Sequence, residues 1–327
     1  MRAAWYDRRG PAREVLVVGD TPDPHPGPGE VRIRLSRSGI SPGDVKKRSG
    51  WQNSAMPFPR VIPHSDGVGI IDAVGPDVDD ARIGLDVWCY GAQSYRPFGT
   101  AAEYTVVPSE LTVPLPGDIT PGIAAQAACL GIAGITGYRA VFADGPIDGL
   151  TVLVYGAAGG VGSIATQMAV HGGAHVIGVV RNPDQLDTVR DYGVTAALLD
   201  ADPDITDQIR AVAPDGVHRI AEVDLAAHID LNADIIATGA VISSYYSSND
   251  RPQIPYWKLG FADTTLRLLG SDDFSPAVRT DAANELTRAL LDGGLHIRVA
   301  DQLPLDKIAD AHEHLEHGTP GRVILHL

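Results

Sequence analysis

The residues of this chain that are best suited to chemistry are the glycines of a seven-residue turn, 156–162, which could bind a phosphate group. An apolar run at 151–155 precedes the turn, apolar residues at helical spacing follow it as far as Gly172 and Gly173, and a second apolar run occupies 175–180. This order of strand, glycine turn, helix and strand is typical of units that bind a dinucleotide through its pyrophosphate. The pattern predicts such a site, with an ordinary glycine-rich loop as the alternative.

Each glycine of the turn has a mechanical purpose. Gly159 and Gly162 occupy the last two glycine positions of the usual pattern, and Ala157 holds the first. Together they allow a tight turn, a close approach of the backbone to the ligand, and close packing of the helix on the strand. The residues that we expect to contact the cofactor in this turn are Gly156, Ala158, Gly159, Gly160 and Val161.

The end of the second strand is expected to select the cofactor. NAD sites usually place Asp or Glu about 20 residues after the glycines, to bond the ribose 2′-hydroxyl. Here the strand runs into Arg181 and Asn182, and Asn182 is also expected to cap the next helix, with Pro183 at its first position. A carboxylate would repel a 2′-phosphate, whereas a guanidinium can bind one in a forked geometry. Arg181 and Asn182 therefore favour NADPH over NADH, with a solvated loop arginine as the alternative.

Composition and charge describe an ordinary globular protein. The chain has 327 residues, more than one core normally supports, so two domains are expected. Its hydrophobic fraction of 44% and charged fraction of 20% argue against disorder. The formal net charge of −15 argues against a nucleic-acid partner and against docking to an anionic membrane. With no apolar run of about 18 residues and no signal segment, we expect a cytoplasmic protein.

Three stretches of the chain differ in their patterning. Residues 1–121 contain short strand-like segments separated by glycine and proline, which predicts a compact, barrel-like, mostly β domain. Residues 122–257 alternate strand and helix patterns, which predicts the parallel sheet of a doubly wound α/β domain. Residues 258–327 leave this alternation, and we expect this tail to fold back onto the first domain. The elements expected in the tail are strands at 264–269 and 323–327 and helices at 276–292 and 306–317.

Short sequence matches along nearly the whole chain resemble one known superfamily. Their order and spacing, rather than any single match, carry the resemblance to the medium-chain dehydrogenase/reductase superfamily, in its zinc-free quinone oxidoreductase branch (zeta-crystallin-like). The matching segments are 1–4, 29–31, 38–44, 48–50, 65–69, 73–75, 136–138, 321–325 and the glycine turn.

The resemblance implies a definite architecture. A Rossmann dinucleotide-binding domain, residues 122–257, would be inserted into a GroES-like, mostly β catalytic domain made of 1–121 and 258–327. It also implies a homodimer, paired through the sheet edge of the nucleotide domain.

The resemblance also addresses zinc by residue type. Zinc-dependent relatives have a cysteine where Ser41 stands and a histidine where Ser65 stands, and neither hydroxyl suits a tetrahedral zinc site. His64 is a single imidazole, which is more often structural. Cys89 and Cys129, the only cysteines, are too few for a structural zinc lobe and are expected to be buried fillers. We therefore expect no metal, and an acceptor that is already electrophilic: a quinone, or an alkene conjugated to a carbonyl.

Matching positions imply further site residues. Ser41 would lie beside the nicotinamide and the substrate, and Thr136 near the nicotinamide ribose. The strand end that holds Ser244 and Tyr245, together with Ser243, would flank the cofactor, and Arg322 would reach toward its phosphates.

The chain also departs from the family pattern. Tyrosines of the acceptor pocket are replaced by Lys46 and Gln52, and the Gln52 position is where related enoyl reductases keep a proton donor. Trp51 would supply an aromatic face to the substrate, with ordinary packing as the alternative. Family contacts to the 2′-phosphate fall on Gln185 and Asp200, which leaves that contact to Arg181 nearly alone.

Three histidines near the C-terminus invite a metal hypothesis. His312, His314 and His317 lie on one expected helix, but only His314 and His317 would be neighbours there. Imidazoles near a helix C-terminus are also favoured by the helix dipole. We therefore expect a solvated helix face.

Three functions remain open from the sequence. The first is an NADPH-dependent reductase of quinones or conjugated carbonyls, with a small-molecule substrate. The second is a 2-alkenal or enoyl-type double-bond reductase on the same scaffold. The third is a non-catalytic protein that binds NADPH.

Overall fold

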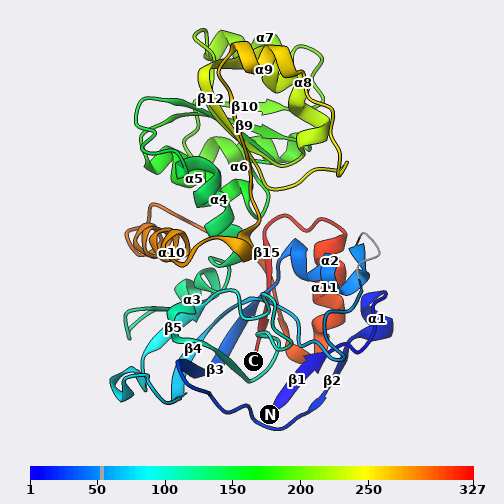
Figure 1. Cartoon of the computed structure of the whole chain (residues 1–327), viewed down its shortest axis with the longest axis vertical. Coiled ribbons are helices and arrows are strands. Elements are labelled where there is room, and N and C mark those ends of the chain that lie inside the picture. Colours follow the sequence, from blue (N-terminus) through cyan, green and yellow to red (C-terminus); the bar gives the residue numbers. More distant parts are fainter. Residues whose placement is uncertain (52–54) are drawn as a thin grey trace. The chain divides into compact units, whose positions relative to one another are not determined.

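The computed structural model describes residues 1–51 and 55–327, and groups them into two compact units. The central unit contains Gly134–Ala282 and Leu291–His296, and the terminal unit contains Met1–Ala133, Ala283–Leu290 and Ile297–Leu327. Figure 1 traces the chain through both units by colour. No helix among the described residues is long and apolar enough to cross a membrane.

The central unit is built on a six-stranded parallel sheet. Its order is β10-β9-β8-β11-β12-β13, so the chain winds outward from β8 to β10 and then crosses to the other side for β11. This is the doubly wound arrangement that the alternation predicts, with its switch point between β8 and β11. The strands are β8 (Thr151–Tyr155), β9 (His175–Val180), β10 (Ala196–Leu199), β11 (Val217–Glu222), β12 (Ile236–Ser244) and β13 (Thr265–Leu268).

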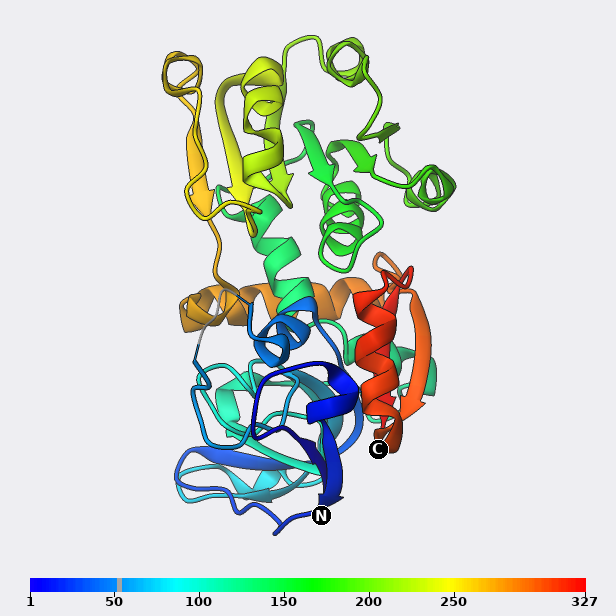
Figure 2. The same ribbon diagram turned by 90° about the vertical axis from the view of Figure 1, so that its right-hand side faces the viewer.

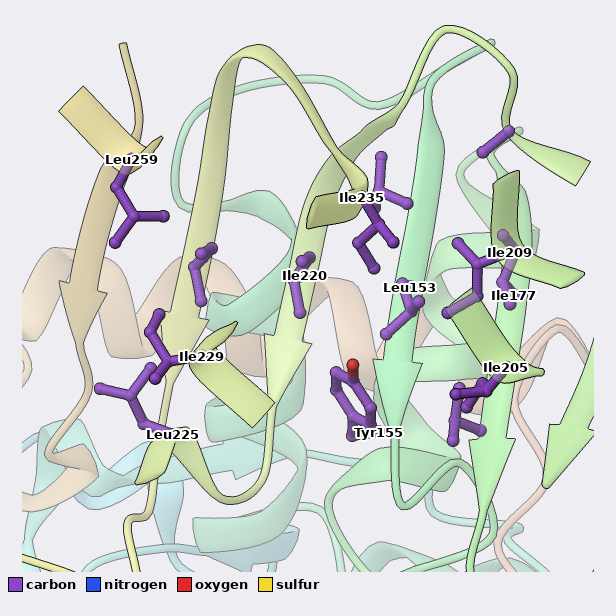
Figure 3. Close-up of a cluster of buried hydrophobic side chains, with 14 residues drawn as sticks. Leu153, Tyr155, Ile177, Ile205, Ile209, Ile220, Leu225, Ile229, Ile235 and Leu259 are labelled. Atoms are coloured by element: carbon purple, nitrogen blue, oxygen red, sulfur yellow. The ribbon is translucent and has the colours of Figure 1, made fainter. Parts of the chain in front are cut away.

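Helices bury both faces of this sheet. Leu153 and Tyr155 of β8 join the core cluster beneath α7 and α8 (Figure 3). Val152 and Val154 join the other cluster, beneath α5 and α6. Alternation along a strand explains this division, and each buried aliphatic side chain contributes about 1.5–3 kcal/mol to folding. The helices are α4 (Ile132–Phe142), α5 (Gly162–His171), α6 (Leu186–Asp191), α7 (Ile205–Val212), α8 (Leu225–Ile235) and α9 (Tyr256–Phe261).

Expected turn chemistry positions these helices. Gly173 follows α5 with φ +82°, in the left-handed region that glycine adopts without strain. Asn182 Oδ1 accepts a hydrogen bond from the backbone N–H of Asp184 at 3.0 Å, so Asn182 caps the 3₁₀ turn η4 (Pro183–Gln185) that leads into α6. Gly193, with φ +83°, follows α6.

The terminal unit contains a seven-stranded mixed sheet and a two-stranded one. The long strand β3 (Glu30–Gly39) is its axis, because it pairs with β4, β6 and β15. The other strands are β1 (Arg2–Trp5), β2 (Val17–Asp20), β4 (Asp66–Val74), β5 (Asp86–Cys89), β6 (Tyr104–Pro108), β7 (Thr112–Pro114), β14 (Val299–Pro304) and β15 (Arg322–His326). The remaining helices are α1 (Ala12–Val15), α2 (Pro42–Ser49), α3 (Pro121–Ala127), α10 (Pro276–Leu291) and α11 (Ile308–Glu316), with 3₁₀ turns η2 (Asp80–Arg82), η3 (Ser109–Leu111), η5 (Ser271–Asp273) and η6 (Leu305–Lys307).

Two expected domain boundaries need correction. The strand that we placed in the tail, β13, pairs in parallel with β12 and completes the central sheet, so the boundary after residue 257 is wrong (the gold edge strand in Figure 2). The boundary after residue 121 is also too early, because residues up to Ala133 belong to the terminal unit. There the backbone N–H of Ile132 donates to both carboxylate oxygens of Asp66, at 3.1 and 2.9 Å.

Candidate functional site

The glycine turn forms a tight bend between β8 and α5. Gly156 has φ +63°, and the N–H of Gly159 donates to its carbonyl at 2.7 Å. A Cβ at residue 162 would lie 2.1 Å from that same carbonyl oxygen, so only glycine fits there. The turn leads directly into the ten-residue helix α5, where the N–H groups of Ser163 and Ala165 donate to the carbonyls of Gly159 and Val161. The positive end of the helix dipole still favours an anion at this turn.

Helix α4 packs close to this turn. A Cβ at Gly137 would lie 2.9 Å from the carbonyl oxygen of Val161 and 3.1 Å from the backbone nitrogen of Ala165. This approach places the neighbouring Thr136, which is buried, beside the start of α5. The structure therefore brings together Thr136, Val161 and the glycines, which come from different parts of the sequence.

Because the strands of the central sheet are parallel, the other expected cofactor residues of this unit lie at the carboxyl end of the sheet. Arg181 follows β9, is exposed, and forms no hydrogen bond or ion pair with any described residue. Asn182 uses its side-chain oxygen as a helix cap, as described above. At the end of β12, the buried Ser244 donates from Oγ to the carbonyl of Tyr246 at 2.9 Å. Burial and the charge of Glu222 raise the pKa of the partly buried Tyr245, so its phenol stays protonated.

The same edge holds a buried polar cluster that sequence reasoning missed. Glu222 ends β11 fully buried and accepts hydrogen bonds from the N–H of Asp224 at 2.6 Å, from Asn232 Nδ2 at 2.7 Å and from His228 Nδ1 at 2.8 Å. Tyr155 donates to Asn232 Oδ1 at 3.0 Å. The available signal was the spacing of Asp224, His228 and Asn232, which puts polar groups four residues apart on one face of the helix.

In the terminal unit, two expected residues from opposite ends of the sequence meet. Ser41 precedes α2, where its N–H donates to Asp44 Oδ2 at 2.7 Å. Arg322, at the start of β15, donates from Nη2 to Ser41 Oγ at 3.2 Å. Both side chains are buried, and Arg322 also hydrogen-bonds Cys129, whose thiol pKa burial raises.

The charge of Arg322 is poorly compensated. Its side chain is 3% exposed, its Nε has no partner among the described residues, and none of their carboxylates lies within ion-pair distance. A hydroxyl and a thiol are uncharged partners, so they do not neutralise this buried guanidinium, and its positive charge can attract an anion.

Trp51 and Lys46 are described residues at positions of the expected acceptor pocket. The Trp51 side chain is 45% exposed, and Lys46 Nζ lies 5.1 Å from its ring centroid. A single exposed aromatic side chain is common on protein surfaces, so the contact of Trp51 with a substrate stays a prediction. Gln52, the position of the missing proton donor, lies outside the described residues.

The expected solvated helix face is wrong for His312. Its side chain is fully buried and its Nε2 lies 3.0 Å from Nε2 of His64, which is also fully buried. His64 Nδ1 in turn lies 2.8 Å from Ser38 Oγ, so both ring nitrogens of the buried His64 have hydrogen-bonding partners, which is typical of a structural imidazole. Burial lowers the pKa of His64 to about 3, and burial with the charges nearby lowers that of His312 well below its ordinary range. The lowered pKa values favour neutral rings, and the 3.0 Å separation fits a hydrogen bond between the two Nε2 atoms.

Metal ligands are not gathered in the described part of the chain. Residues 1–51 and 55–327 contain no group of three His, Cys, Asp or Glu side chains that could hold an ion. Cys89 and Cys129 are free and buried, as predicted.

Comparison with known proteins gives matches across both units. Residues 27–117 match the alcohol dehydrogenase GroES-like domain, and residues 160–249 match the family described as zinc-binding dehydrogenase. The quinone oxidoreductase of Homo sapiens is 28% identical over 340 residues, which covers 99% of this chain and 97% of the human one. The structure of a mycobacterial quinone oxidoreductase is 27% identical with a TM-score of 0.86, and that of a mycobacterial protein complexed with NADPH is 26% identical with a TM-score of 0.84. Both structural matches cover 100% of each chain.

Proposed function

The chain belongs to the medium-chain dehydrogenase/reductase superfamily, in its quinone oxidoreductase branch, and we propose that it transfers hydride from NADPH to a quinone or similar conjugated carbonyl without zinc. As a member of that branch it is an oxidoreductase with a nicotinamide cofactor. The observation that carries the finer proposal is the sheet edge of the central unit, where the glycine turn and the exposed Arg181 end neighbouring parallel strands.

The choice of NADPH rests on charge. The end of β9 carries the unpaired guanidinium of Arg181 and no carboxylate, and such a group can bind a 2′-phosphate through two parallel hydrogen bonds. The glycine turn supports a pyrophosphate site. A Cβ at residue 162 would lie 2.1 Å from the carbonyl oxygen of Gly156, so the turn is as tight as a dinucleotide-binding turn requires. We propose that Arg322 adds a second positive charge for the phosphates, since its own charge is uncompensated.

The absence of a catalytic zinc is proposed from residue type. Ser41 and Ser65 stand where zinc-dependent relatives have cysteine and histidine, and Ser41 Oγ is already hydrogen-bonded to Arg322. A hydroxyl held by a guanidinium is a poor zinc ligand. The acceptor must then be electrophilic by itself, which suits a quinone or an alkene conjugated to a carbonyl.

The chain's residues would bind and orient the reactants. A bound NADPH supplies the hydride. Ser41 Oγ accepts a hydrogen bond from Arg322, so its own O–H can be donated to the carbonyl oxygen of the acceptor, on which negative charge develops. We propose that Thr136, Ser244 and Tyr245 position the nicotinamide end of the cofactor, and that Trp51 stacks against the acceptor.

A turnover screen tests the proposal. We expect NADPH consumption with a quinone to exceed that with a 2-alkenal, and Ser41→Ala to lower kcat with a smaller effect on the NADPH affinity. Thr120→Ala, which removes a hydroxyl from the cap of α3, is the matched control. Tight NADPH binding without turnover would favour a non-catalytic protein, preference for the 2-alkenal would favour the double-bond reductase, and stoichiometric zinc in elemental analysis would contradict the mechanism.

The edge strand of the central sheet supports the proposal of a homodimer. The outer side of β13 has no strand partner among the described residues, and Leu268 on it is 72% exposed. Helix α9 exposes Trp257 and Phe261, at 69% and 82%. Pairing β13 with its own copy would satisfy the free edge and cover Leu268. Light scattering should show a dimer for the wild type and a monomer for Leu268→Asp; a monomeric wild type would contradict this part of the proposal.

A further inference from the structure

His228 lies between two carboxylates at the carboxyl edge of the central sheet. Its Nδ1 is 2.8 Å from Glu222 Oε1, and its Nε2 is 3.6 Å from Asp200 Oδ1. The ring also stacks on Tyr155, with a centroid distance of 4.1 Å and an interplanar angle of 3°. Three contacts therefore fix the imidazole in one orientation.

The charges around His228 favour its protonated form. Glu222 faces it from β11, Asp200 from the end of β10, Asp224 from the start of α8, and the phenol of Tyr155 from β8. Burial lowers the pKa of His228, but the hydrogen bond to Glu222 and the charges of the three acids outweigh burial and raise that pKa above its ordinary value. An imidazolium here compensates a cluster that is otherwise strongly negative.

Asp200 and Arg181 follow the adjacent parallel strands β10 and β9, at the carboxyl end of the sheet. Leu199 and Val180 are partners in the parallel pairing of β10 and β9, and the N–H of Asp200 donates to the carbonyl of Val180 at 2.8 Å. Asp200 and Arg181 are therefore the next residues on two adjacent strands. The Asp200 carboxylate nevertheless faces His228, and Arg181 has no ion pair within the described part of the chain.

We infer that His228 is a specificity-determining residue of the nucleotide site: its imidazolium holds and neutralises Asp200, and so leaves Arg181 available for a phosphate on the ribose. This inference rests on the proposed function. Without that cation, the Asp200 carboxylate would pair with Arg181 or repel the 2′-phosphate. Either outcome weakens the binding of NADPH but not that of NADH. His228 acts through Asp200 and is a positioning residue.

The test measures the affinity of each cofactor by nicotinamide fluorescence. We expect His228→Gln to lower the affinity for NADPH by about tenfold and the affinity for NADH by less than about twofold. Adding Asp200→Asn should return the NADPH affinity to within about twofold of the wild type, because the charge that His228 compensates is then absent. His218→Gln, on β11 of the same unit, is the matched control and should change neither affinity.

The pH dependence gives a second readout. At pH 7 and above the 2′-phosphate is largely ionised, so its own charge changes little. The wild type should lose its preference for NADPH over NADH as the pH rises through the folded pKa of His228, which is raised above its ordinary value, whereas Asp200→Asn alone should keep that preference. This comparison leaves His228 intact and decides the question even if His228→Gln does not fold.

Equal weakening of both cofactors in His228→Gln, failure of Asp200→Asn to restore NADPH, or identical pH profiles for wild type and Asp200→Asn would each overturn the inference. Failure of the proposed function looks different: the wild type would then bind neither cofactor, or would bind NADPH without reducing any acceptor in the turnover screen.

Discussion

Two histidine sites, one in each unit, have opposite electrostatics: His64 and His312 are fully buried, and His228 is partly buried. In the terminal unit, His64 and His312 meet each other and the hydroxyl of Ser38, and their pKa values fall. In the central unit, His228 meets Glu222 and Asp200, and its pKa rises. Burial lowers the pKa in all three cases, so the carboxylates decide the sign.

The difference teaches how each site is used. The His64–His312 pair joins the segment that precedes β4 to α11, and with both pKa values lowered it carries no positive charge for a ligand. A charged imidazole beside a half-exposed carboxylate, at the edge where parallel strands end, can change what binds there. The predictions below are ordered from the largest expected effect to the smallest.

Acid should destabilise the protein through the His64–His312 pair. Their folded pKa values lie below the unfolded value, so their contribution is fully present above about pH 6.5 and is lost as the pH falls toward 3. The expected slope is about 1.4 kcal/mol per pH unit for each imidazole. Urea unfolding at pH 7 and pH 5 measures it. The double variant His64→Leu/His312→Leu should lose most of this slope, and the exposed His317→Gln should keep it; a wild-type slope equal to that of the double variant would contradict the account.

Glu222→Gln should lower the pKa of His228, so that it resembles the pKa values of His64 and His312. Removing the carboxylate at 2.8 Å leaves burial dominant, so the pKa of His228 should fall below its ordinary value. Loss of one partner of a buried ion pair is expected to lower the free energy of unfolding by about 3 kcal/mol. Urea unfolding and an NMR titration of the His228 ring measure the two effects. The exposed control Glu14→Gln should change stability by less than about 0.5 kcal/mol, and an unchanged His228 pKa would break the comparison.

His228→Gln should alter the pH dependence of stability in the opposite direction to the histidine pair. Because the folded pKa of His228 is raised, its contribution is present below about pH 6.5 and is lost as the pH rises through the folded pKa. Urea unfolding between pH 6 and pH 9 should therefore show a steeper decline for the wild type than for the variant. Parallel curves would mean that His228 is neutral in the folded protein.

Asp200→Asn should have the smallest effect on His228. Asp200 lies 3.6 Å from Nε2 and is partly exposed, whereas Glu222 is closer and buried. The NMR titration should show a smaller drop in the His228 pKa than in Glu222→Gln, with little change in stability. A larger drop would reverse the assigned roles of the two acids.

Much of the central unit could be predicted from local pattern. The limits of β8 and β9 agree with the apolar runs expected at 151–155 and 175–180, because apolar periodicity and glycine ends are local signals. Strand β14 was missed: only alternate residues are partly buried and it ends at Pro304, so its apolar signal is weak. The place of β13 was also missed, because sheet membership depends on pairing with β12 rather than on its own residues.

The site was predictable to a lesser extent. The glycine turn and Arg181 followed from local spacing. The contact between Ser41 and Arg322 joins residues 281 positions apart and was not expected, because the family resemblance named the two residues only as separate neighbours of the cofactor. His312 was assigned to the wrong environment because we compared it with the other histidines. Its spacing to Ile308, Ala311 and Leu315 is that of a buried helix stripe, and this signal was in the sequence.

The most direct test of the account is a titration of the wild-type protein and of Arg181→Gln with NADPH and NADH, followed by nicotinamide fluorescence. We expect the wild type to bind NADPH at least about tenfold more tightly than NADH, and the variant to lose that difference while NADH binding is unchanged. Equal binding of both cofactors by the wild type, or a preference for NADPH that survives in Arg181→Gln, would contradict the assignment of the phosphate site to the end of β9.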